Sequence, residues 1–177
     1  MKTGGAVLFS EIEIQRRVVE LGQQISEDYR DKALTMIGIL NGCFVFMADL
    51  ARQIDEAIPV EVEFMTVSSY GDNKVSSGSV RVEHDVQNAV EGKNIVLVEG
   101  IVDSGRTLAG VIEVLTARNP RSLRVAALLD KQTARAVPLP RLDYVGFRIP
   151  DAFVVGYGLD FAQRYRNLRE IRILDGD

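Results

Sequence analysis

The chain has 177 residues, 46% of them hydrophobic and 26% charged, which is typical of a soluble globular protein. This length suits one domain, and we expect residues 1–177 to form a single domain. The formal net charge of −4 argues against a nucleic-acid-binding protein, because such proteins need a basic surface. The sequence has one cysteine, no signal-peptide core and no membrane-length apolar run. We therefore expect a cytoplasmic protein with neither a nucleic acid nor a membrane as partner.

The first third of the chain is predicted to alternate between helices and a strand. Ser10 and Glu13 have the spacing of a capping box at a helix start. Apolar residues then recur at helical spacing and indicate a helix from Ser10 to about Tyr29: Ile14, Val18, Leu21 and Ile25. Residues 34–40 are a continuous apolar run, typical of a buried strand. An Asn-Gly turn then leads into a helix predicted over residues 43–54.

The middle of the chain contains further strands and one long polar segment. Strands are predicted over residues 60–67, 79–84 and 94–99, followed by a helix over residues 107–118. Residues 68–79, rich in serine and glycine, have little to bury. A surface loop of this length is uncommon unless it is functional or disordered.

The last third is predicted to consist mainly of strands. Residues 123–130 form a buried strand, and residues 143–150 and 151–160 form two short strands separated by Pro150-Asp151. A final strand covers residues 170–174. Strands that alternate with helices indicate an α/β fold with a mostly parallel sheet covered on both faces.

One turn, within the sequence VLVEGIVDSGRTL at residues 96–108, has the features of an anion site. It follows a predicted strand and opens a helix, where unpaired backbone N–H groups and the helix dipole favour an anion. Gly105 allows close approach of the backbone, and Ser104 and Thr107 add hydroxyl donors. The Walker and Rossmann glycine patterns are both absent. On the residues alone, an ordinary turn with Asp103 or Ser104 as the helix cap is equally compatible.

The same segment resembles the phosphoribosyl pyrophosphate (PRPP) motif of the type I phosphoribosyltransferases. Four further segments resemble the hypoxanthine-guanine branch of that family: GILNGCFVFMADL, SSYG, LLDKQTAR and DYVGFRIPDAFVVGYGLDFAQRYRNL. The resemblance implies a twisted, mostly parallel sheet flanked by helices, with a small hood made by the N- and C-terminal segments. It also implies transfer of phosphoribosyl from PRPP to hypoxanthine or guanine, giving IMP or GMP and pyrophosphate, with Mg²⁺ as cofactor. A homodimer or homotetramer is implied as well.

The resemblance assigns a role to each motif residue. Asp103 would be the general base that accepts the purine N7 proton. The 5′-phosphate would be held by Asp103, Ser104, Gly105, Arg106 and Thr107. The ribose would be held by Glu99 and Gly100, and the metal by Glu99 and Asp160. The purine would be contacted by Lys131, Phe153, Val154 and Asp160. Pyrophosphate would be held by Leu40, Asn41, Gly42 and Arg166, and a mobile loop would carry Ser69 and Tyr70.

Several of these residues also have ordinary structural interpretations. Lys131 alone would be taken as solvated surface, and Phe153 and Val154 as core strand residues. Cys43 is interpreted as a buried, unreactive thiol, because the only histidine, His84, lies far away in the sequence. The sequence leaves open the choice between the purines and whether the Leu40–Asn41 peptide is cis.

Two positions depart from the family pattern. The usual Glu-Asp pair is Glu99-Gly100 here, and Asn41 replaces the usual Lys or Arg. A lost charge-assisted hydrogen bond costs about 1.5–3 kcal/mol, so we expect PRPP binding to weaken by roughly one to two decades unless Glu99 and a water compensate. An alternative is therefore a non-catalytic homologue that binds PRPP or nucleotide as a regulator. An RNA-binding regulator with this fold is a third hypothesis, against which the acidic balance argues.

Overall fold

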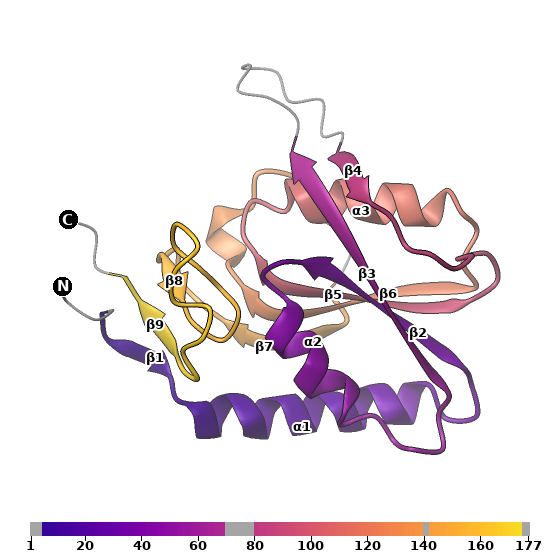
Figure 1. The fold of residues 1–177 in the computed structure, drawn as a ribbon, viewed down its shortest axis with the longest axis horizontal. Coiled ribbons are helices and arrows are strands. Elements are labelled where there is room, and N and C mark those ends of the chain that lie inside the picture. Colours follow the sequence, from indigo (N-terminus) through magenta and orange to yellow (C-terminus); the bar gives the residue numbers. More distant parts are fainter. Residues whose placement is uncertain (1–4, 70–79, 140–141, 175–177) are drawn as a thin grey trace.

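The computed structural model describes residues 5–69, 80–139 and 142–174. At its centre lies a six-stranded sheet with strand order β4-β3-β2-β5-β6-β7 (Figure 1). The strands are β2 (Leu34–Leu40), β3 (Val60–Ser69), β4 (Val80–His84), β5 (Asn94–Val102), β6 (Ser122–Asp130) and β7 (Tyr144–Arg148). Neighbouring strands are parallel except β3 and β4, which are antiparallel. The predicted α/β class with a mostly parallel sheet is confirmed.

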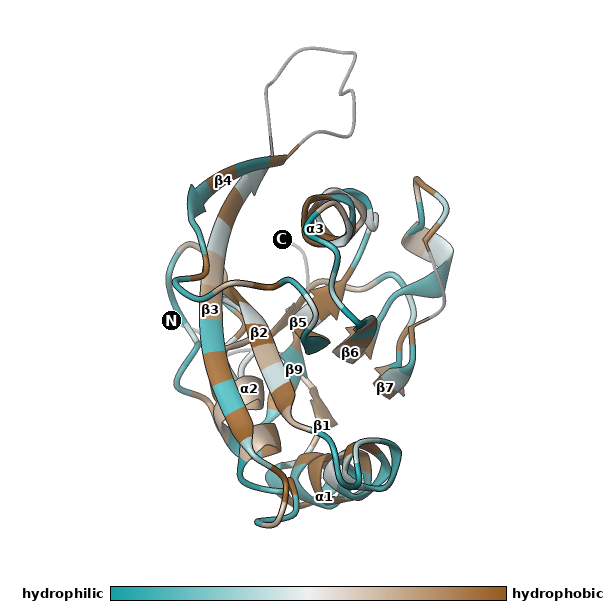
Figure 2. Ribbon diagram, turned by 90° about the vertical axis from the view of Figure 1, so that its right-hand side faces the viewer, coloured by the Kyte–Doolittle hydropathy of each residue, from teal (hydrophilic) through white to brown (hydrophobic). Residues whose placement is uncertain are grey.

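Helices cover both faces of this sheet. Figure 2 shows α3 (Arg106–Thr116) on one side, and α1 (Glu11–Asp28) and α2 (Phe44–Ala51) on the other. Along β5, Val96 and Val98 pack with α1 and α2, whereas Ile95 and Leu97 pack with α3. Successive side chains of a strand point to opposite faces, so a strand buried on both faces must be apolar throughout. This explains the continuous apolar runs of the central strands.

The helices lie close to their predicted positions. Ser10 caps α1: the Ser10 Oγ accepts from the Glu13 N–H at 3.4 Å, and the Glu13 carboxylate accepts from the Ser10 N–H at 2.9 Å. The predicted capping box is therefore present, and Tyr29 follows the helix as its C-cap. No helix within residues 5–69, 80–139 and 142–174 is long and apolar enough to cross a membrane.

A second, three-stranded sheet forms the predicted hood. It contains β1 (Val7–Phe9), β9 (Ile171–Ile173) and β8 (Val154–Val155) in that order, all antiparallel, and lies beside the main sheet (Figure 1). The sequence pattern does not predict β1. Three residues are too few to show a period, and the partner strand of β1 comes from the other end of the chain.

Three local predictions need correction. The strand predicted over residues 151–160 is wrong beyond β8, because positive φ angles at Gly156, Tyr157 and Gly158 turn the chain there. The strand β5 continues past its predicted end at Glu99 to Val102. A short 3₁₀ helix, η1 (Gln132–Ala134), follows β6 and was not predicted.

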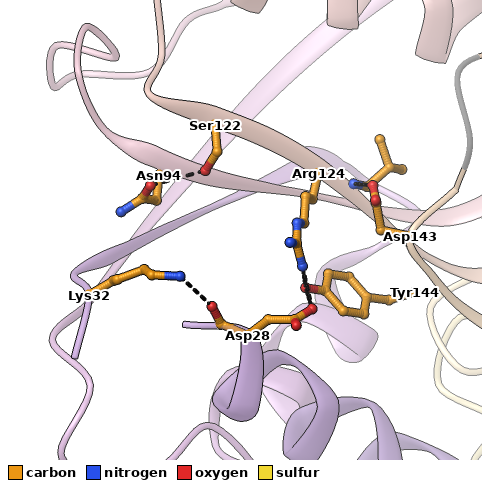
Figure 3. Close-up of polar contacts among 8 residues, drawn as sticks. Asp28, Lys32, Asn94, Ser122, Arg124, Asp143 and Tyr144 are labelled. Atoms are coloured by element: carbon orange, nitrogen blue, oxygen red, sulfur yellow. Dashed lines mark hydrogen bonds and ion pairs between the residues drawn. The ribbon is translucent and has the colours of Figure 1, made fainter. Parts of the chain in front are cut away.

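Polar side chains join the end of α1 to the sheet (Figure 3). The Asp28 carboxylate accepts a hydrogen bond from the Tyr144 hydroxyl at 2.6 Å and pairs with Arg124. Arg124 also donates to the Tyr144 hydroxyl at 2.7 Å. These contacts link one helix to the starts of two strands, β6 and β7. They lie at the amino ends of the strands.

We expect Asp28→Ala to lower the free energy of unfolding by about 1–2 kcal/mol, because the buried Tyr144 hydroxyl loses its acceptor. Asp28→Asn should cost only about 0.5 kcal/mol, because the amide still accepts and the exposed ion pair with Arg124 contributes little. Urea unfolding of both variants measures the difference. Equal losses in the two variants would show that the ion pair, rather than the hydroxyl contact, stabilises this corner.

Candidate active site

The turn after β2 and the turn after β5, both predicted to bind substrate, lie together at one edge of the sheet. At this edge the chain leaves the two strands in opposite directions. The strands β2 and β5 are parallel neighbours, yet the chain leaves β2 toward β3 and leaves β5 toward β6 on the opposite side. Ligands of open α/β sheets bind at the carboxyl ends of the strands, at such a switch point. A cavity of about 260 Å³ lies there. Its lining joins the end of β2 to the turn after β5 and includes Leu40, Gly42, Glu99, Asp103, Ser104, Gly105 and Thr107.

The turn between β5 and α3 presents free backbone donors. Gly105 is the N-cap of α3 and has a φ of 83°, in the left-handed region that favours glycine. The N-cap, Gly105, has no side chain, but Ser104 Oγ accepts from the Arg106 N–H at 3.5 Å, which agrees with the hypothesis that Ser104 helps to cap this helix. The N–H groups of Ser104 and Gly105 have no hydrogen-bond partner within the described residues. They are available for an anion.

Glu99 is half-buried and lines the cavity. Burial raises the pKa of its carboxyl from 4.5 to about 7. One carboxylate oxygen accepts from the Gly100 N–H at 2.8 Å. Without a bound cation, this carboxyl therefore keeps its proton to a higher pH than an exposed glutamate does.

This burial gives a pH-dependent stability. Between about pH 4.5 and 7 the folded chain keeps the Glu99 proton that the unfolded chain has released, so the free energy of unfolding falls as pH rises. The fall attributable to Glu99 should be roughly 2–3 kcal/mol. Urea unfolding with EDTA and without substrate, compared with Glu99→Gln, measures it. Parallel stability curves for the two proteins from pH 4.5 to 7.5 would contradict this prediction.

The two departures from the family pattern are neighbours in space. A Cβ added to Gly100 would lie 2.7 Å from the Gly42 carbonyl oxygen, next to Asn41. A Cβ on Gly158 would lie 2.8 Å from the same oxygen. The Leu40–Asn41 peptide is cis. Gly100 therefore permits a close approach between the β5 strand and the 41–42 turn, which a side chain at position 100 would disturb.

Lys131 reaches the predicted base from the end of β6. The residue is only 5% exposed, and its Nζ lies 3.1 Å from Asp103 Oδ2 and 3.4 Å from Asp151 Oδ1. The alternative of a solvated surface lysine is therefore wrong. A buried ammonium needs such partners, because an unpaired buried charge is costly. The structure brings the two side chains predicted for base recognition and proton transfer into direct contact.

Two aromatic rings lie beside the hood. Phe153 is 52% exposed and meets Phe161 edge to face, with 5.4 Å between ring centroids. The alternative that Phe153 is a core residue is wrong. The Val154 side chain is buried in β8, in agreement with the interpretation as a core residue. Only the backbone of Val154 therefore remains as the group predicted to recognise the base. An exposed ring offers a face on which a flat heterocycle can stack.

Asp160 and Arg166 form an ion pair in the turns after β8. Arg166 Nη2 lies 2.8 Å from Asp160 Oδ1, and Arg166 Nη1 donates to the Gly158 carbonyl at 2.8 Å. Gly158 also approaches the 41–42 turn. The pair predicted to contact metal and pyrophosphate is thus linked, through Gly158, to the predicted pyrophosphate turn.

The chain matches the family model described as the phosphoribosyl transferase domain over residues 9–162. The chain belongs to the phosphoribosyltransferase family. It is 48% identical over 168 residues to a hypoxanthine-guanine phosphoribosyltransferase of Bacillus subtilis, with 95% of this chain and 92% of the relative covered. A hypoxanthine-guanine phosphoribosyltransferase of Dictyostelium discoideum is 50% identical over 166 residues, covering 92% and 91%.

Solved structures of phosphoribosyltransferases share the fold. A hypoxanthine phosphoribosyltransferase from Staphylococcus aureus superimposes with a TM-score of 0.92 at 41% identity, covering 97% of this chain and 92% of that one. The predicted fold family and the predicted hypoxanthine-guanine resemblance are both confirmed.

Some site residues of this phosphoribosyltransferase escaped the sequence analysis. Asp151 was noted only as a break between strands, yet it pairs with Lys131. Arg135 lies in the LLDKQTAR motif, which assigns it no role, yet it donates a hydrogen bond to the Asp103 carbonyl. Both contacts join segments far apart in the sequence, so no local pattern reveals them. Tyr70 lies outside the described residues, and Ser69 ends β3. The loop predicted to close the site stays a prediction.

Proposed function

We propose that this protein is a purine-salvage phosphoribosyltransferase that converts PRPP and hypoxanthine, guanine or both into IMP or GMP and pyrophosphate. The observation that carries the proposal is the contact between Asp103 and Lys131 beside a turn with free amides. An anion-binding turn alone suits many phosphate ligands. A carboxylate and an ammonium side by side suit the edge of a 6-oxopurine, where the N7–H donates a hydrogen bond and O6 accepts one.

Different residues of the chain bind different groups of the substrate. The 5′-phosphate is bound by the amides and hydroxyls of residues 104–107, at the N-terminus of α3, where the helix dipole favours an anion. The ribose hydroxyls donate to Glu99. Because the 5′-phosphate and the ribose hydroxyls are both held, the ribose C1 stays oriented toward the purine. The reaction then takes place between two oriented groups and no longer depends on a random encounter in solution.

Proton transfer is assigned to Asp103. As the purine forms its bond to C1 and pyrophosphate departs, the purine N7 proton passes to the Asp103 carboxylate. Lys131 donates to O6 and orients the ring, while Asp151 remains beside the ammonium as its second carboxylate. Phe153 stacks on the base. Positive charge that develops on the ribose is stabilised by the neighbouring carboxylates.

The residues present fit a magnesium ion shared with the substrate. No group of three or more His, Cys, Asp or Glu side chains that could hold a metal ion occurs among the described residues. Magnesium commonly takes one or two carboxylates plus substrate phosphates, and Glu99 and Asp160 are the carboxylates we assign to it. Bound there, the ion would neutralise pyrophosphate oxygens. Asn41, Gly42 and Arg166 bind the same leaving group.

We further infer a homodimer or homotetramer that works in the cytoplasm. Exposed apolar side chains gather on α2 and β3, namely Phe44, Val62 and Phe64. Sedimentation of the wild type and of Phe64→Glu tests this inference. A wild-type monomer would contradict it. The cytoplasmic location is supported by the free, buried Cys43, whose pKa burial raises to about 12.

The deciding experiment mixes the protein with Mg²⁺, PRPP and hypoxanthine or guanine and follows nucleotide formation by absorbance. We expect turnover with at least one of the two bases. The alternative of a non-catalytic homologue predicts that PRPP binds without turnover. The retained contact between Asp103 and Lys131 favours the enzyme, because a PRPP sensor has no use for purine-binding groups.

A further inference from the structure

Three successive carbonyls of the base-bearing turn are held by one segment of the chain. The Val102 carbonyl accepts from the Lys131 N–H at 3.0 Å, and the Ser104 carbonyl accepts from the Ala136 N–H at 3.0 Å. Between them, the Asp103 carbonyl accepts from Arg135 Nη1 at 2.8 Å. Two of these donors are backbone groups. The middle one is a side chain, so it alone can be removed by substitution.

These bonds determine where the amides of the turn point. In a planar trans peptide the N–H lies opposite the C=O of the preceding residue. With the Asp103 and Ser104 carbonyls bonded to residues 135 and 136, the N–H groups of Ser104 and Gly105 point away from that segment. These are the N–H groups without a partner among the described residues. Rotation of the Asp103–Ser104 peptide would place a carbonyl, rather than a donor, before the phosphate.

Arg135 is itself fixed by a buried charge. Its Nη2 pairs with Asp130 Oδ1, and Asp130 is only 3% exposed at the end of β6. A buried carboxylate requires a cationic partner, so the guanidinium has little freedom to leave. Its planar fork lets it bond Asp130 and the Asp103 carbonyl at once, which lysine cannot reproduce in full.

We propose that Arg135 is a positioning residue that locks the Asp103–Ser104 peptide. It thereby aims the phosphate-binding amides and holds the backbone that carries the Asp103 carboxylate. The inference rests on the phosphate site assigned under the proposed function. In this proposal Arg135 acts through the carbonyl of Asp103 and not by contact with the substrate.

The test separates positioning from stability. Arg135→Gln alone would leave Asp130 buried without a cation, so the main variant is Asp130→Asn with Arg135→Gln, in which both partners are neutral. Arg135→Lys keeps the charge and loses the fork. Arg118→Gln is the control, because Arg118 forms a two-pronged pair with Asp85 away from the site. Binding of ribose 5-phosphate is measured by calorimetry, with melting temperature and steady-state kinetics alongside.

We expect the double variant to bind ribose 5-phosphate about 10-fold more weakly and to lose kcat, while its KM for hypoxanthine stays within about 2-fold. Arg135→Lys should fall between it and the wild type, and Arg118→Gln should match the wild type. A crystal structure of the double variant should show the Asp103–Ser104 peptide rotated.

Two results would overturn the proposal, and each refutes a different part of it. Wild-type affinity and kcat in a folded double variant, or in Arg135→Lys if the double variant does not fold, would refute the role of Arg135 alone. Failure of the wild type to bind ribose 5-phosphate would refute the phosphate site itself, and the inference with it.

Discussion

Replacing Asp103 by asparagine should lower kcat by about 10²–10³, because an amide cannot accept the N7 proton that the carboxylate takes as the glycosidic bond forms. The affinity for PRPP should change little. The proposed phosphate site consists of backbone amides of the turn, which the substitution leaves in place. Steady-state kinetics with saturating PRPP and hypoxanthine, together with calorimetric binding of PRPP, separate the two effects.

Asp151→Asn is a matched control for this prediction. Asp151 also places a carboxylate oxygen near Lys131 Nζ, at 3.4 Å, but lies outside the β5–α3 turn. If Asp103 acts mainly as the counter-ion of the lysine, both substitutions should lower kcat to a similar extent. If Asp103 is the proton acceptor, Asp151→Asn should cost less than about 10-fold. Retention of kcat within 10-fold in Asp103→Asn would refute the assignment of the base.

Adding a side chain at Gly100 should raise the KM for PRPP by about 10-fold or more. A Cβ at this position would lie 2.7 Å from the Gly42 carbonyl oxygen, so the 41–42 turn must move. Overpacking a rigid contact costs about 1–3 kcal/mol, and each 1.4 kcal/mol is a factor of ten in affinity. Gly100→Ala tests this steric effect alone, by kinetics with varied PRPP.

Gly100→Asp then tests the missing carboxylate. From the family pattern alone, the aspartate should strengthen PRPP binding by roughly one to two decades. From the close packing of Gly100 against Gly42, the Gly100→Asp variant should bind PRPP no better than the wild type, because the added Cβ displaces the 41–42 turn. A KM well below that of the wild type would show that this turn adapts easily and that the lost carboxylate is a true deficit.

The position of Gly100 against Gly42 also bears on the other departure. Asn41 precedes Gly42 in the turn that Gly100 approaches, so an acid and a cation of the family pattern are both missing from one small region. Their loss together leaves the local charge balance unchanged. This offers a physical reason for two departures that, in the sequence, look independent.

The sequence by itself determined most of the elements and located the turn to which the base is assigned. Continuous apolar runs indicated strands buried on both faces, and the spacing of Ser10 and Glu13 located the start of α1. These features succeed because they are local: a period or a cap involves residues within a few positions of one another. The PRPP motif is local for the same reason.

Only the tertiary structure decided which distant residues complete the candidate site. The pairing of Asp151 with Lys131, the bond from Arg135 to the Asp103 carbonyl and the approach of Gly100 to Gly42 each join different segments. The short β1 likewise exists only because β9 lies beside it. Such contacts depend on how β2, β5 and β6 align at their carboxyl ends, and no periodicity within any one segment encodes that alignment.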